Sequence, residues 1–240
     1  MMLKNNASIV DDRGYNQGFK ETPALIKRME RRADWMLAEM AGGSDKKVLE
    51  IGCGTGYVSY YLAKKTEMKI IGSDLCEPFI EQASKTYQLS NLSYETLDFN
   101  EAARSVHKTF DYIIGNGILH HLYYNLDEAL ITFKKILNPN GKIIFMEPNI
   151  YNPYVAAIFK NTKLRNWAKL EPDEMAFSKD FIQQKLRATE FKNIKITYKD
   201  FLLPGVPEIM ITPSIVVGDI LEKTPLKLVS QSILICATLD

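Results

Sequence analysis

The sequence predicts an α/β fold, in which helices cover both faces of a mostly parallel sheet. Between residues 46 and 149, short apolar segments of strand length alternate with segments of helical periodicity. Because parallel neighbouring strands need a crossover connection, this alternation is typical of right-handed strand–helix–strand units. A cluster of glycines directly after the first apolar segment is a further feature of such folds.

The first predicted helix occupies about residues 22–40. Thr22 is a favourable N-cap residue, and Pro23 suits the first helical position, where its missing N–H is not needed. Apolar residues then recur at helical spacing until Gly42 and Gly43 end the pattern.

The alternating region contains five predicted strands and three helices. The strands are predicted at residues 46–52, 69–74, 92–98, 110–117 and 141–149. The helices between them are predicted at residues 56–64, 78–87 and 126–137.

The last third of the chain departs from this rhythm. Residues 150–173 are mixed aromatic and basic, and a helix at 179–189 leads to a strand at 193–201. Residues 202–228 are apolar and rich in proline, and a strand at 232–239 follows. The stretch between these two late strands is too short for an ordinary parallel connection together with a regular helix. We expect one domain over residues 1–240, with a core at 46–150 and 180–240 and cap elements at 1–45 and 151–178.

Composition excludes several classes of protein. The formal net charge of +1 gives no overall field that would attract nucleic acid, and no nucleic-acid partner is expected. No apolar run reaches the roughly 18 residues of a membrane-spanning helix, and the first residues lack a signal-peptide core. Cys53, Cys76 and Cys236 form neither a disulfide framework nor a metal-binding spacing. We therefore expect a cytoplasmic protein with reduced thiols and no metal.

The strongest local signal is the segment Glu50-Ile51-Gly52-Cys53-Gly54-Thr55-Gly56, between a strand and a helix. Glycines there allow a tight turn and a close approach of the backbone to a ligand. Asp74 ends the next strand, where a carboxylate can accept hydrogen bonds from ribose hydroxyls. A nicotinamide dinucleotide is the alternative ligand. Tyr57 stands where the dinucleotide fingerprint needs a small residue, and Glu50 suits an amino group or sulfonium better than a pyrophosphate.

A wider pattern resembles one family. The segments VLEIGCGTGYVSYYLAK, IIGSD, FDYIIGNGILHHL and LNPNGKIIFMEPN are similar to the ordered motifs of class I S-adenosylmethionine-dependent methyltransferases. The greatest similarity is to the small-molecule branch, which includes quinone-biosynthesis and glycan- or lipid-cluster methyltransferases. The resemblance covers residues 46–150. It implies a Rossmann-like sheet of seven strands with an antiparallel last strand, and a cofactor bound across the strand ends.

The resemblance also implies which residues bind S-adenosylmethionine and its product S-adenosylhomocysteine. Around the methionine, its amino group and the ribose it places Glu50, Gly52, Cys53, Gly54, Gly56 and Asp74. Around the adenine it places Leu75, Asp98 and Phe99, although Asp98 can alternatively be a turn carboxylate before Asn100. Under the methionine it places Asn116, Gly117 and Ile118, and Tyr15 is added to the cofactor-binding set.

Catalytic candidates follow the fourth predicted strand. Methyl transfer from a sulfonium depends mainly on orientation and desolvation, and an oxygen nucleophile can also need a base. His120 and His121 could accept that proton, and Glu147 at the end of the fifth strand is a further candidate. The alternatives are that the histidines fix the loop and contact the cofactor, which we favour over catalysis, and that Glu147 is a loop partner.

The acceptor is predicted from what differs from the common core. The segment Gly115-Asn116-Gly117 replaces the [DNS]-P-P-[YF] motif, which argues against methylation of adenine or glutamine amino groups. Aromatic and methionine residues near Tyr15, at 151–177 and at 202–228 favour a small apolar or amphipathic acceptor, methylated on oxygen or carbon. These residues can instead be core, and residues 202–228 can be a homodimer face or a lipid-binding surface.

Three functions remain at this point. The favoured one is a methyltransferase that uses S-adenosylmethionine. The others are a nicotinamide-dependent oxidoreductase and a methyltransferase-like protein that binds cofactor or a partner without catalysis. Binding of cofactor without product across a broad acceptor panel would distinguish the last of these.

Overall fold

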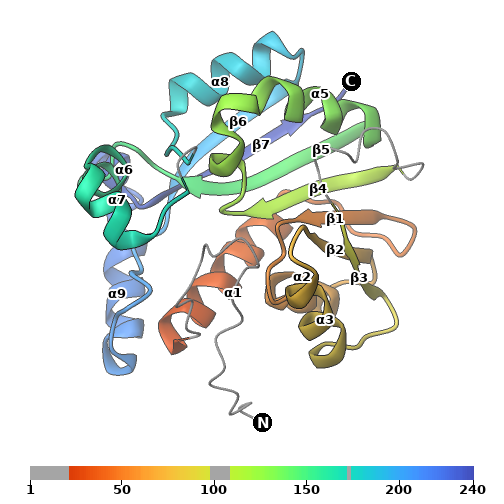
Figure 1. Cartoon of the computed structure of the whole chain (residues 1–240), viewed down its shortest axis with the longest axis horizontal. Coiled ribbons are helices and arrows are strands. Elements are labelled where there is room, and N and C mark those ends of the chain that lie inside the picture. Colours follow the sequence, from red (N-terminus) through yellow and green to blue (C-terminus); the bar gives the residue numbers. More distant parts are fainter. Residues whose placement is uncertain (1–21, 98–108, 172–173) are drawn as a thin grey trace.

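The computed structural model describes residues 22–97, 109–171 and 174–240 of the chain. At its centre is a seven-stranded sheet with the order β3-β2-β1-β4-β5-β7-β6 (Figure 1). The strands are β1 (Lys47–Ile51), β2 (Lys69–Asp74), β3 (Leu92–Thr96), β4 (Phe110–Asn116), β5 (Leu137–Pro148), β6 (Lys192–Lys199) and β7 (Ser232–Thr238).

The strand pairing confirms the predicted sheet. Parallel pairs join β3 to β2, β2 to β1, β1 to β4 and β4 to β5. The last strand, β7, is antiparallel to both of its neighbours, β5 and β6. The order of the strands reverses between β1 and β4, which is where ligands bind in open α/β sheets.

Helices cover both faces of the sheet (Figure 1). They are α1 (Pro23–Leu37), α2 (Tyr57–Lys65), α3 (Glu77–Thr86), α5 (Leu126–Ile136), α6 (Pro153–Lys160), α7 (Thr162–Ala168), α8 (Lys179–Ala188) and α9 (Glu208–Leu221). Because side chains alternate along a strand, neighbouring residues of β1 serve different cores. Val48 packs in a core with residues of α1 and α2, and Leu49 packs in the core shared with α5 and α8.

Helix α1 begins where the sequence predicts. The Thr22 hydroxyl accepts a hydrogen bond from the Leu25 N–H at 3.1 Å, which satisfies a donor of the first turn. Met29, Ala33 and Met36 are buried against the sheet in the core of one face. The apolar stripe of this helix therefore contributes to the core, and the cap expected over residues 1–45 stays a prediction.

Helix α9 lies within residues 202–228, a stretch in which the sequence predicted no particular element, and it connects two antiparallel strands. It is a regular helix although Pro213 lies inside it, and only Ile211 and Gly218 are buried along its length. Gly218 allows close packing, because a Cβ there would lie 3.0 Å from the Cβ of Phe201. Proline tends to break a helix, but this packing and the apolar residues after Pro213 outweigh that tendency. Its outward side exposes large apolar side chains, namely Ile209, Met210, Val216, Val217 and Ile220.

Candidate active site

The loop between β1 and α2 has a backbone that requires glycine. Gly52, Gly54 and Gly56 have φ angles of +64°, +52° and +84°, in the left-handed region that other residues rarely adopt. A Cβ at Gly52 would lie 2.6 Å from the Ile118 side chain, and one at Gly56 would lie 2.7 Å from Tyr94. A Cβ at Gly54 would meet no described atom within 4 Å. Gly52 and Gly56 are thus needed for packing, whereas Gly54 faces open space.

Asp74 connects the second strand to this loop. Its carboxylate accepts hydrogen bonds from the Gly54 N–H at 2.8 Å and from the Cys76 N–H at 2.9 Å. The Cys53 N–H bonds to the Ser73 carbonyl at 2.9 Å, so the loop is fixed to the end of β2 at two points. Leu75, next to Asp74, keeps 45% of its surface exposed. The carboxyl end of β2 therefore presents a fixed carboxylate beside an exposed apolar side chain.

Glu50 is buried beneath the glycine loop, with 1% of its surface exposed. Its carboxylate accepts a hydrogen bond from the hydroxyl of Ser59, in the first turn of α2. Burial raises the pKa of Glu50 to about 7, although the hydrogen bonds from Ser59 oppose the increase. Glu50 therefore helps to hold the start of α2, a role that the sequence did not indicate.

The raised pKa of Glu50 predicts a pH-dependent stability. Between its ordinary value of 4.5 and about 7, the folded state keeps the proton and the unfolded state releases it. The free energy of unfolding therefore falls as pH rises through this window, by up to about 3 kcal/mol. The Glu50→Gln variant has no group that titrates at this position. The difference in unfolding free energy, variant minus wild type, should therefore increase by about 1–3 kcal/mol between pH 5 and pH 8.

Urea unfolding of both proteins at the two pH values measures this difference. Glu128→Gln is the control, because Glu128 is an exposed residue of α5. A Glu50→Gln variant whose stability changes with pH as the wild type's does would contradict the assignment.

The end of β4 lies beside the glycine loop. Gly117 has a φ of +74°, and its N–H bonds to the Met146 carbonyl at 2.7 Å. Ile118 then covers Gly52 and Gly115, at both of which a Cβ would overlap its side chain. The Asn116 side-chain oxygen accepts a hydrogen bond from Arg32 of α1 at 2.8 Å. The predicted residues after β4 thus lie next to the predicted loop after β1.

The turn that follows β4, η1 (Leu119–Asn125), carries the two histidines. Glu147 accepts hydrogen bonds from the N–H groups of Ile118 and Leu119 at 3.0 and 2.8 Å. Its other oxygen lies 2.8 Å from Nδ1 of His120. Glu147 has no exposed surface, and both of its carboxylate oxygens are engaged in these contacts. The carboxylate orients the His120 ring, and a carboxylate facing Nδ1 favours the tautomer with its proton on that nitrogen.

His121 contacts two carboxylates that the sequence analysis missed. Its Nδ1 lies 3.3 Å from Glu174 and 3.5 Å from Glu171. Burial lowers the pKa of His121, but the hydrogen bond with Glu171 and the charges of Glu174, Glu171 and Glu147 outweigh it, and the net pKa is raised. The Met175 N–H bonds to the His120 carbonyl at 3.1 Å, which brings the distant segment to the turn. No local motif marks these glutamates, because the contact joins segments about fifty residues apart.

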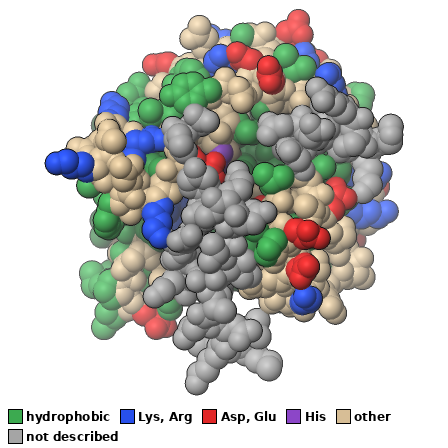
Figure 2. Space-filling model, in the orientation of Figure 1, with side chains coloured by type: hydrophobic (Ala, Val, Ile, Leu, Met, Phe, Trp, Pro, Cys, Tyr) green, Lys and Arg blue, Asp and Glu red, His purple; other side chains and the backbone are tan. Residues whose placement is uncertain are grey.

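Three predicted cofactor-binding residues lie outside the described residues, namely Tyr15, Asp98 and Phe99. The remaining candidates come from three strand ends that meet at one edge of the sheet. Figure 2 shows that, on this face, histidine and acidic atoms reach the surface beside hydrophobic side chains.

The described residues fit a cofactor with a nucleoside and an amino acid part. Gly54 leaves open space over the loop, and Leu75 offers an apolar surface for a base. Asp74 is a fixed carboxylate beside both, of the kind that accepts hydrogen bonds from ribose hydroxyls. The fold and these residues define a nucleoside-binding α/β protein, and sequence comparison identifies which class.

A profile of the methyltransferase domain family matches residues 43–201. The chain therefore belongs to the methyltransferase domain family, and its cofactor is S-adenosylmethionine. The matched span contains the glycine loop, Asp74 and both histidines of η1.

Two curated proteins illustrate the relationship. The chain is 31% identical over 144 residues to the S-adenosyl-L-methionine-dependent Diels-Alderase iccD of Talaromyces variabilis, a match that covers 58% of this chain and 47% of that protein. It is 33% identical over 99 residues to the malonyl-[acyl-carrier protein] O-methyltransferase of Priestia megaterium, covering 41% and 35% respectively. The chain thus matches about half or less of the length of these relatives.

A solved structure supports the fold. The S-adenosylmethionine-dependent methyltransferase of Archaeoglobus fulgidus superposes with a TM-score of 0.63 at 20% identity, covering 89% of this chain and 94% of that one. Among the described residues, no helix is both long enough and apolar enough to cross a membrane.

Proposed function

We propose that the chain transfers the methyl group of S-adenosylmethionine to an oxygen or carbon atom of a small apolar or amphipathic acceptor. The proposal rests on the position of the His120–His121–Glu174 cluster. The cluster follows Ile118 in the chain, and the Ile118 side chain covers the glycine loop. The cofactor loop and two imidazoles suited to proton transfer thus lie close together at this edge.

The cofactor supplies an electrophilic methyl group on a sulfonium. In the transfer, the acceptor atom forms a bond to carbon as the sulfur–carbon bond breaks, and an oxygen acceptor also loses a proton. His120 is suited to take that proton, because Glu147 fixes its Nδ1–H and leaves the lone pair on Nε2. Buried surroundings exclude water, which favours the displacement.

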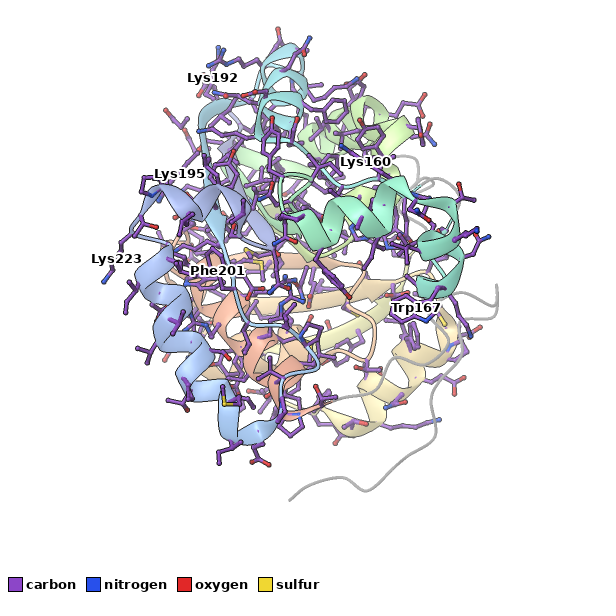
Figure 3. All side chains as sticks on the ribbon, turned by 90° about the vertical axis from the view of Figure 1, so that its left-hand side faces the viewer. Lys160, Trp167, Lys192, Lys195, Phe201 and Lys223 are labelled. Carbon is purple, nitrogen blue, oxygen red and sulfur yellow. The ribbon has the colours of Figure 1, made fainter. Side chains whose placement is uncertain are left out.

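The surroundings of the histidines favour an apolar acceptor. The ring of Phe159, in α6, meets the His120 ring edge to face, with centroids 6.0 Å apart. Val155, Phe159 and Ala176 form a small apolar cluster under α6 and α7. Trp167, on α7, is 73% exposed, and Figure 3 shows it with Lys160 on the α6–α7 pair. This pair is the expected cap over the acceptor.

The relatives support transfer to oxygen and also a second candidate function. One is named as an O-methyltransferase, which agrees with an acceptor hydroxyl or carboxyl. Another is named as an S-adenosyl-L-methionine-dependent Diels-Alderase, an activity that uses the same cofactor for a different reaction. A chain that binds the cofactor without transferring its methyl group is therefore the second candidate.

The test is release of S-adenosylhomocysteine when the chain is incubated with S-adenosylmethionine and a panel of phenols, quinone-like compounds and glycolipid hydroxyls. Methyl transfer gives stoichiometric release and a product heavier by one CH2 unit. Binding of the cofactor without release across the panel would favour the second candidate.

The role of His120 is tested by the His120→Asn variant with an acceptor that turns over. We expect kcat to fall by roughly 100-fold or more, as for loss of a general base, while the Kd for S-adenosylhomocysteine changes less than about threefold. An unchanged kcat with a weaker Kd would show instead that the histidine contacts only the cofactor.

A further inference from the structure

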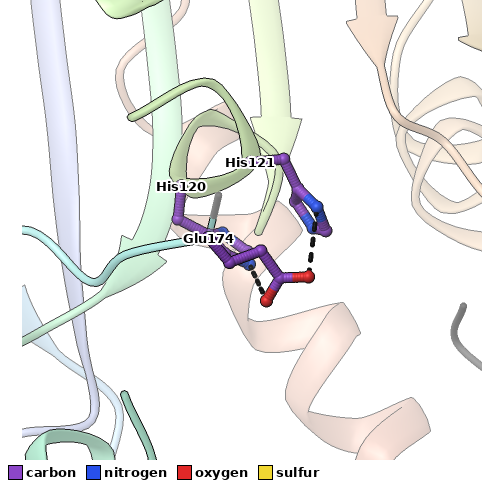
Figure 4. A group of neighbouring side chains, drawn as sticks. All are labelled: His120, His121 and Glu174. Atoms are coloured by element: carbon purple, nitrogen blue, oxygen red, sulfur yellow. Dashed lines mark ion pairs between the residues drawn. The ribbon is translucent and has the colours of Figure 1, made fainter. Parts of the chain in front are cut away.

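We infer that the His120–His121–Glu174 cluster is a binding site for a divalent transition-metal ion. One ligand atom from each of these three side chains lies within 4.8 Å of the others. Figure 4 shows the two imidazoles and the carboxylate directed toward one another. His120 and Glu174 are buried and His121 is half-buried, so the cluster is not a set of solvated surface charges.

The distances fit ligands of a single ion. Nε2 of His120 lies 3.8 Å from one Glu174 oxygen, and Nδ1 of His121 lies 3.3 Å from the other. Ligand atoms that each lie about 2.0–2.2 Å from one ion are separated by roughly 3–4 Å. Small rotations of these side chains are enough to form the coordination sphere.

One carboxylate oxygen lacks a hydrogen-bond donor. Glu174 is 3% exposed, and its Oε2 has no hydrogen-bond partner among the residues that the structure describes. The other oxygen accepts from the Glu171 N–H at 3.0 Å. Because a buried carboxylate oxygen without a partner is unfavourable, a cation in front of it would stabilise the arrangement.

His120 has the second contact that metal-bound histidines need. Its Nδ1 bonds to Glu147, which directs Nε2 toward Glu174. A carboxylate behind a histidine fixes the ring and raises its basicity as a ligand. Glu147 is in turn fixed by backbone N–H groups, so this support is rigid.

The distribution of charge around the cluster also favours a bound cation. The carboxylates of Glu147, Glu171 and Glu174 surround two imidazoles in a region mostly shielded from water. A divalent cation would offset this concentration of negative charge. Two imidazoles with one carboxylate favour Zn²⁺ or Fe²⁺ over Mg²⁺, which prefers oxygen ligands.

The backbone carbonyls of Glu171 and Glu174 are both held by one side chain. Arg165 of α7 donates hydrogen bonds to the carbonyl of Glu174 at 2.9 Å and to that of Glu171 at 2.8 Å. Three protein ligands leave positions for water or for an oxygen of the acceptor. This last role rests on the proposed function: a bound ion would polarise the acceptor hydroxyl and lower its pKa, so that the proton could pass to water without His120 as the base.

The test is calorimetric titration of the chelator-treated full chain with Zn²⁺, together with the visible absorption of Co²⁺ as a probe of nitrogen coordination. We expect one equivalent bound with a Kd in the micromolar range or below, and no comparable binding of Mg²⁺. Glu174→Gln keeps the size of the side chain and should weaken Zn²⁺ binding by at least 10-fold, while Glu128→Gln should leave it unchanged.

Two results would overturn the inference: no Zn²⁺ binding by the wild type, or equal affinity in Glu174→Gln with an unchanged melting temperature. Binding of S-adenosylhomocysteine is measured on the same samples. Failure of that binding with Zn²⁺ still bound would count against the proposed function and leave the metal site intact.

Discussion

The Asp74→Ala variant should bind S-adenosylhomocysteine at least 100-fold more weakly than the wild type. Asp74 holds the N–H groups of Gly54 and Cys76, and in our account it also accepts hydrogen bonds from the ribose. Its removal therefore loses charge-assisted hydrogen bonds to the ligand and the preformed shape of the loop. Isothermal titration calorimetry measures the Kd of both proteins.

The matched control is Asp127→Ala, which removes an exposed carboxylate of α5 paired with Lys185. That variant should bind the ligand as the wild type does. Circular dichroism shows whether each variant is folded. A folded Asp74→Ala protein with the wild-type Kd would contradict the placement of the ribose.

The Asp200→Ala variant should be less stable than the wild type by about 3–5 kcal/mol. Asp200 is 2% exposed and accepts hydrogen bonds from Arg28 at 2.6 Å and from Arg32 at 2.8 Å. Burial would raise the pKa of Asp200, but the two arginine charges outweigh it and hold the pKa below its ordinary value. Burial also lowers the pKa of Arg32 to about 10, so the loss of Asp200 leaves a costly charge without compensation.

A control on the same helix is available. Arg31 pairs with Asp219 at 2.5 Å, and the Asp219 side chain is 48% exposed. Asp219→Ala should cost less than about 1 kcal/mol, as for other surface pairs. Guanidinium unfolding of the two variants measures the difference. Similar losses in both would show that the buried cluster does not support the fold as argued.

The same cluster also connects stability to the site. Arg32 donates to Asn116 at the end of β4 and to Ser232 of β7. Asn116 is the last residue of β4 and begins the segment that leads to the histidines. The hydrogen bond from Arg32 therefore holds this segment in place. Both arginines come from α1, so this helix is tied to the strand ends by hydrogen bonds as well as by its apolar contacts.

Local patterns predicted the sheet well. The strand at residues 69–74 has the predicted bounds, and Thr22 and Pro23 start α1 as expected. These features depend on apolar periodicity and on helix capping, both of which are determined by residues close together in the sequence. Pairing of β7 against both neighbours agrees with the resemblance to the family, although spacing alone did not specify it.

The prediction was weaker where contacts between distant residues decide the structure. Helix α9 forms despite Pro213, because Gly218 packs closely on Phe201. Its exposed apolar side remains a predicted dimer or lipid-binding surface.

The same reason limits prediction of the site. The glycine loop and Asp74 are marked by their own motifs. Glu171 and Glu174 contact His121 only because folding brings distant parts of the chain together. Arg32 and Asn116, which also form a hydrogen bond, are 84 positions apart. No residue pattern near these side chains signals their partners.

A crystal structure of the chain with S-adenosylhomocysteine is the most direct test of where the cofactor binds. We expect the ribose against Asp74, the ligand over Gly54, and the sulfur directed toward His120 and His121. Electron density for the ligand at another edge of the sheet, or a sulfur directed away from the histidines, would contradict the account.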